Sequence, residues 1–114
     1  MTEIVWADEG DGEFGAYVER HSDGVEIRAT LMAPGSEFND GPGWAYSMYW
    51  DTGEDPDIAY ECHLSGEVES RADAEAAVLA GVSAALIQGN EDTEAKAAIV
   101  AALEGAGITH GGFR

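Results

Sequence analysis

Hydrophobic and polar positions alternate over roughly the first seventy residues and then take on a helical spacing. β-Branched and aromatic residues first alternate with polar ones between Gly, Asp and Pro clusters. Alanine then dominates, and apolar residues recur every three or four positions. The pattern predicts an α+β fold: a meander of about five antiparallel strands in one layer and one or two C-terminal helices in the other. We expect a single domain over 1–114, with strands within about 3–69 and helices at about 71–88 and 91–104.

The first three strands are predicted from alternation and from turn residues. Glu3–Asp8 is a candidate first strand, Glu9–Gly12 a glycine-rich turn, and Phe14–His21 the returning strand. Ser22–Gly24 ends in Asp-Gly, which favours the next hairpin turn. The third strand then has two distinct faces, because its apolar residues Val25, Ile27, Ala29 and Leu31 alternate with the polar Glu26, Arg28 and Thr30.

An aromatic strand follows a long loop. Glycines and prolines over Ala33–Gly43 predict that this segment is an exposed loop. In the strand at 44–50, one side carries Trp44, Tyr46, Met48 and Trp50, and the other carries Ala45, Ser47 and Tyr49. We interpret the first side as the floor of the core, because large aromatics dominate burial in small domains. A binding surface made of the same aromatics is the alternative.

The last predicted strand follows an acidic turn at Asp51–Asp57. Its apolar side is Ile58, Tyr60, Cys62 and Leu64, and Glu61 and His63 lie on the opposite side. We expect Gly66 to fray its continuation through Glu67 and Glu69.

Two helices are predicted after residue 70. Ser70 can cap the first, with Asp73 three residues later, and the helix should reach about Gln88. Its apolar stripe is Ala74, Ala77, Val78, Gly81, Val82, Ala85 and Leu86, in which small residues at four-residue spacing let the helix approach the sheet closely.

The second helix is predicted between Gly89-Asn90 and two glycines. Asn90 can cap it, and Glu91, Asp92 and Glu94 lie in its first turn, where the helix dipole favours negative charge. Gly105 and Gly107 should end it, and the tail Ile108–Arg114 should pack through Ile108 or Phe113. Its apolar face is Ala95, Ala98, Ile99, Ala102 and Leu103.

Charge restricts the partners that this chain can bind. The sequence has 23 Asp and Glu against 5 Lys and Arg, a formal net charge of −18 over 114 residues. A typical small soluble domain has a net charge of about 2–8 in magnitude. Coulomb repulsion therefore argues against direct binding to nucleic acid or to an anionic membrane, and favours basic protein surfaces and cations. With 45% hydrophobic residues, the chain should nevertheless fold.

Few residues point to chemistry or to a compartment. Cys62 is the single cysteine, and the longest apolar run, Ala76–Ile87, is too short to span a bilayer. With no N-terminal leader apparent, we expect a cytoplasmic protein and no membrane contact. Cys62 and His63 should point to opposite faces of a strand, and His21 and His110 have no supporting pattern, so all three histidines are predicted to lie on the surface or in turns. We expect no enzyme activity and no cofactor.

Two acidic turns could attract cations. One contains Asp8, Glu9, Asp11 and Glu13, and the other Asp51, Glu54, Asp55 and Asp57; neither has the spacing of a twelve-residue calcium loop. We therefore expect loose counter-ions and no specific metal site.

Three hypotheses account for the charge. In the first, the carboxylates imitate a phosphate backbone and occupy the basic cleft of a DNA- or RNA-binding protein. Same-face residues on a strand recur every 6.6 Å or so, and rows of them can approximate duplex charge spacing of about 1.7 Å per charge. In the second, the acidic surface only keeps a small domain hydrated, for example in concentrated salt. In the third, a ligand or substrate binds at the aromatic sheet face or at the Gly-Pro loop.

We favour the first hypothesis: a non-enzymatic interaction module that binds a basic partner and inhibits it. In composition alone, a short, acidic, Ala- and Gly-rich chain of this kind resembles small phage-encoded inhibitors of restriction or CRISPR defence. The sequence is also compatible with a homodimer. The candidate contact residues are the acids on turns and at the adjoining helix start, namely Asp8, Glu9, Asp11, Glu13, Asp51, Glu54, Asp55, Asp57, Glu67, Glu69 and Asp73.

Overall fold

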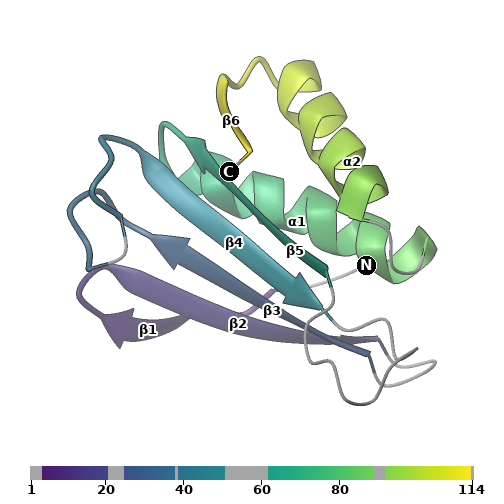
Figure 1. Ribbon diagram of the computed structural model, residues 1–114, viewed down its shortest axis with the longest axis horizontal. Helices are drawn as coiled ribbons and strands as arrows, with labels where there is room; N and C mark the ends of the chain where they lie inside the picture. The colour runs from purple at the N-terminus through teal and green to yellow at the C-terminus, as the bar shows by residue number, and fades with distance from the viewer. Residues whose placement is uncertain (1–3, 21–24, 38, 51–61, 89–91, 114) are drawn as a thin grey trace.

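The fold is a six-stranded antiparallel sheet with two helices on one face (Figure 1). The computed structural model describes residues 4–20, 25–37, 39–50, 62–88 and 92–113. The sheet order follows the chain order, so each strand pairs with its sequence neighbours. The predicted two-layer α+β meander is confirmed, with six strands where about five were expected. The elements are β1 Ala7–Gly10, β2 Glu13–Arg20, β3 Val25–Met32, β4 Trp44–Trp50, β5 Cys62–Val68, α1 Arg71–Gln88, α2 Asp92–Gly105 and β6 His110–Phe113.

The core lies between the sheet and α1. Helix α1 crosses β3, β4 and β5, and α2 packs beside it and reaches β5 (Figure 1). Tyr46, Met48 and Trp50 of β4 are fully buried in one cluster with Val78 and Val82 of α1. Three of the four residues on the aromatic side of β4 therefore form the core floor, as we favoured, and the fourth, Trp44, is half-buried and stacks on Phe14.

Gly81 brings α1 close to its neighbours, which confirms the predicted close approach. A Cβ added there would lie 2.8 Å from the Met48 Sδ and 3.0 Å from the Ile99 Cδ1. A larger residue would push α1 away from both β4 and α2. The absence of a side chain at this position thus sets the spacing of three elements.

The start of α1 and the end of α2 have the predicted caps. The Ser70 Oγ accepts a hydrogen bond from the Asp73 amide at 3.2 Å, and α1 runs to Gln88 as expected. Helix α2 ends in a glycine motif in which Gly107 has φ 71° and the Ile108 amide donates to the Leu103 carbonyl at 2.9 Å.

Two predicted apolar positions differ in the structure. Ala102, expected on the apolar face of α2, is exposed, because that helix packs through Ala95, Ile99 and Leu103 at four-residue spacing. Conversely, Ala84 of α1 is buried although it lay outside the predicted stripe.

The first strand is four residues long and starts later than predicted. Asp11 and Gly12 both have positive φ, 54° and 76°, and form the turn. Because strand pairing extends outward from this turn, β1 covers 7–10 in place of 3–8. Ile4 and Trp6 precede the strand and pack partly buried against the core.

Strand β5 continues to Val68, so the expected fraying at Gly66 is wrong. The Tyr46 ring lies over Gly66, where any side chain would collide with the Tyr46 hydroxyl. Glycine thus allows the strand to pass beneath the ring, and the ladder persists.

The tail forms a sixth strand, β6, where we expected only packing. It pairs with β5 through Gly66 with Phe113 and Val68 with His110. Ile108 and Phe113 pack against the core, as predicted.

The loop at 33–43 is less exposed than expected, because Asn39 lies buried at its centre. The Asn39 amide donates to the Met32 and Gly43 carbonyls, each at 2.9 Å, and so ties the two ends of the loop together. Several predicted features lie outside the described residues, namely the turns at 22–24 and 51–57, the strand positions Ile58 and Tyr60, and the caps at Gly89 and Asn90.

Candidate functional site

One end of the sheet collects three chain connections. In a meander, the β1–β2 turn, the β3–β4 loop and the β5–α1 connection all fall at the same end, on the left in Figure 1. The cross-strand row Glu13, Met32, Ala45 and Glu67 marks it. We call this part of the molecule the acidic end, because nine carboxylates lie there: Asp8, Glu9, Asp11, Glu13, Glu37, Asp40, Glu67, Glu69 and Asp73.

Seven of the eleven predicted contact residues thus meet at the acidic end. Glu37 and Asp40 also lie there and were not predicted from the sequence. Their position in the loop before β4 could have indicated them. The other four predicted residues, Asp51, Glu54, Asp55 and Asp57, lie outside the described residues. Trp50 and Cys62, which flank that segment, pair at the opposite end of the sheet.

The acidic end is largely open to solvent. Most of its carboxylates are exposed, and Glu13, Glu67 and Asp73 are half-buried. Arg71 lies among them, with its guanidinium 4.0 Å from the Phe14 ring centre and its Nε 3.9 Å from Glu75. Within the described ranges, no three acids, histidines or cysteines are arranged to hold a metal ion.

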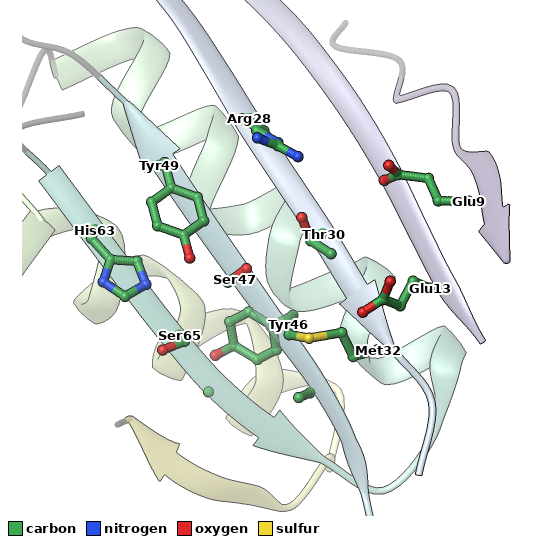
Figure 2. A pocket seen from close by; sticks show the side chains of 12 residues that line it. Glu9, Glu13, Arg28, Thr30, Met32, Tyr46, Ser47, Tyr49, His63 and Ser65 are labelled. Atoms are coloured by element: carbon green, nitrogen blue, oxygen red, sulfur yellow. The ribbon is translucent and has the colours of Figure 1, made fainter. Parts of the chain in front are cut away.

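A groove occupies the sheet face that the helices leave open (Figure 2). Its volume is about 580 Å³, within the usual range of ligand pockets. The groove is built mainly by strand residues whose side chains point away from the core. On β4 these are Ala45, Ser47 and Tyr49, which the sequence placed on the side opposite to Tyr46, Met48 and Trp50.

A row of rings and one cation forms one wall. Arg28, Tyr49 and His63 line the groove and are direct cross-strand partners on β3 to β5. Tyr17 of β2 pairs with Arg28 and extends the row beyond the groove lining. The Tyr49 and His63 rings stack at 4.4 Å with an interplanar angle of 2°, and the Arg28 guanidinium lies 5.7 Å from the Tyr17 ring centre. Such a row presents aromatic area to a ligand at small entropic cost.

The floor consists of small residues in the next row. Gly15, Thr30, Ser47 and Ser65 pair across the same four strands. The Glu9 carboxylate folds over Gly15 and closes the groove at the β1 end (Figure 2). Within the described part of the chain, the hydroxyls of Thr30, Ser47 and Ser65 have no hydrogen-bond partner.

Three charged side chains line the groove without pairing to one another. Glu9 and Glu13 approach from the acidic end, and Arg28 from the opposite wall (Figure 2). None of the three forms an ion pair with another described residue. His63 likewise makes no hydrogen bond to the groove serines there, so the described lining contains no activated nucleophile. The arrangement is suited to binding a ligand that carries both donors and acceptors.

His110 has a different environment from the surface or turn that we predicted. Its Nε2 lies 2.6 Å from the Tyr46 hydroxyl, and its Nδ1 accepts a hydrogen bond from the Gly112 amide at 3.2 Å. The accepting Nδ1 leaves the proton of the neutral ring on Nε2, which then donates to Tyr46. Burial lowers the pKa of His110 and raises the pKa of the Tyr46 phenol. His63 is exposed on β5, and His21 lies outside the described residues.

Comparisons with known proteins add no functional identity: no family model, no curated protein and no solved structure matches this chain. In the described ranges, neither helix is long and apolar enough to cross a membrane.

Proposed function

We propose that this protein is a non-enzymatic binding module whose acidic end captures a basic partner protein. The observation that supports the proposal is the convergence of nine carboxylates from three separate connections on one end of the sheet. Individual exposed ion pairs contribute little, so affinity comes from the summed field.

The partner that fits best is a cytoplasmic nucleic-acid-binding protein, such as a host-defence protein. The cleft of such a protein binds phosphates through Lys and Arg side chains, and a row of carboxylates can bind to the same side chains. In this role the chain is a nucleic-acid mimic and an inhibitor, comparable to phage-encoded anti-defence proteins. Electrostatic steering makes association fast and steeply dependent on salt.

The test measures binding to a panel of basic nucleic-acid-binding proteins at rising salt. Charge reversal by Asp11→Lys, Asp40→Lys and Glu69→Lys should abolish low-salt binding, since all three carboxylates are exposed at the acidic end. As a control, Glu104→Lys changes an exposed acid on α2 and should weaken binding only slightly. Equal loss in the control, or no binding to any panel member, argues against the proposal.

The second candidate is that the acidic surface serves hydration alone. Glu19 and Glu26 pair across β2 and β3 at the opposite end of the sheet, so acids are not confined to the acidic end. Under this candidate the free energy of unfolding rises with salt, and charge reversal at the acidic end changes stability without removing any partner.

A further inference from the structure

We propose that the open-face groove holds an extended segment of about three residues from the basic partner, with one Lys or Arg side chain between Glu9 and Glu13. The inference rests on the proposed function in one respect, that the partner is basic. It adds a defined anchor to a contact that would otherwise depend on the summed field alone.

The dimensions of the groove fit a peptide. The open floor row Thr30, Ser47 and Ser65 crosses three strands, and two spacings of about 4.8 Å give a length of about 10 Å. An extended chain advances about 3.3 Å per residue, so about three residues fill that length. Larger side chains flank the floor, Glu13 and Met32 on one side and Arg28, Tyr49 and His63 on the other, and they favour one direction for the segment across the sheet.

The floor offers hydrogen bonds that the protein itself leaves unused. Ser47 is only 5% exposed, yet its hydroxyl has no partner among the described residues. The hydroxyls of Thr30 and Ser65 beside it also have no partner among the described residues. A peptide backbone carries alternating donors and acceptors, and a hydroxyl can serve either. A bound segment therefore satisfies a floor that a purely apolar ligand would leave unpaired.

Charge gives the segment a direction. Glu9 and Glu13 lie at one side of the groove without an ion pair to another described residue, and a cationic side chain placed there gains charge-assisted hydrogen bonds from both. Arg28 lies at the other wall, where it repels a second cation and donates to backbone carbonyls. Tyr49 and His63 supply the stacked aromatic wall that often anchors protein contacts.

The test uses two acetylated and amidated pentapeptides, Gly-Ala-Arg-Ala-Gly and the same peptide with neutral citrulline in place of arginine. Binding is measured at low ionic strength by calorimetry and by backbone amide shifts. We expect shifts clustered at Gly15, Thr30, Ser47 and Ser65. The arginine peptide should bind about fivefold more tightly, since a partly exposed pair is worth up to about 1 kcal/mol.

Variants then separate the groove from the net charge. Glu9→Gln with Glu13→Gln should remove the preference for arginine, whereas Asp11→Asn with Glu69→Gln removes as much charge outside the groove and should preserve it. Ser47→Leu fills the floor and should weaken both peptides about tenfold, with Ala97→Leu on exposed α2 as the size-matched control. Arg28→Gln, on an exposed side chain, tests the opposite wall if Ser47→Leu proves unfolded by thermal melting.

The outcomes distinguish the inference from the proposed function. Dispersed amide shifts, equal loss in the two double variants, or unchanged binding in Ser47→Leu would each overturn the groove as the peptide site. In those cases the proposed function is still supported if the protein binds basic proteins and loses that binding only on charge reversal at the acidic end. Tighter binding of a saccharide than of the arginine peptide would also overturn the inference, because it assigns the groove to another ligand class.

Discussion

The two faces of the same sheet differ in what their residues do. On β4, Trp50 is fully buried under α1, and its neighbour Tyr49 stands on the open face beside His63. Along the strand, the core side carries large apolar groups, and the open side carries a methyl, a hydroxyl and a phenol. Since burial of apolar area supplies most of the folding free energy, the core face determines stability. The open face is then left free to acquire a binding surface.

The largest expected effect contrasts these two neighbours. Trp50→Ala should lower the free energy of unfolding by about 3–5 kcal/mol, because it opens a cavity in the core. Tyr49→Ala removes a half-buried ring from the open face and should lower it by less than about 1.5 kcal/mol. Chemical denaturation of the two variants checks the difference, and similar losses would mean that both faces support the fold.

The second comparison uses two glycines. Gly66→Ala places a methyl against the buried Tyr46 ring and should cost about 1–3 kcal/mol. The three atoms nearest to a Cβ added at Gly15 all belong to the Glu9 carboxylate, whose exposed side chain can swing into solvent, so Gly15→Ala should change the free energy of unfolding by less than about 1 kcal/mol. Thermal melting measures both, and a larger loss at Gly15 would contradict an open, adaptable groove.

A third prediction concerns the pH dependence of the core face. Burial lowers the pKa of His110 below its ordinary 6.5, so the unfolded chain takes up this proton at a higher pH than the folded one does. Its contribution is therefore fully present above about pH 6.5 and is lost as pH falls through that value toward the folded pKa. Denaturation of wild type and His110→Gln between about pH 7 and about pH 5 should show a shallower decline in the variant. A parallel decline would assign the loss to other groups.

The smallest expected effect is at Tyr17. Its side chain is 62% exposed at the outer end of the ring row. Tyr17→Ser removes the contact with Arg28 and should change the free energy of unfolding by no more than about 0.5 kcal/mol. Denaturant midpoints can resolve this shift, and a loss as large as that of Tyr49→Ala would extend the stabilising role to the whole row.

Alternation along single strands predicted the fold and the composition of both faces. The buried core-side residues are Ile27, Ala29 and Leu31 of β3 and Tyr46, Met48 and Trp50 of β4. Ser70 and Gln88 bound α1, because local pattern and capping act within a few residues. Strand β6 was missed because Gly111 and Gly112 have low strand propensity, and only pairing with β5 orders them.

The groove escaped prediction for another reason. Thr30, Ser47 and Ser65 become one floor only when two cross-strand registers are known, and turn geometry sets those registers. The fold of Glu9 over Gly15 depends further on the short turn at Asp11. The acidic end, by contrast, follows from meander connectivity once the strands are assigned, although Glu37 and Asp40 were not chosen in advance.

The sheet order has a kinetic consequence. Strands β1 to β5 pair with their immediate neighbours in sequence, so these contacts have low contact order. Strand β6 reaches β5 only after both helices have been traversed, and its Tyr46 to His110 hydrogen bond spans 64 positions. We therefore expect the hairpins to assemble early, and the C-terminal strand to dock late in refolding, after the helical layer has formed.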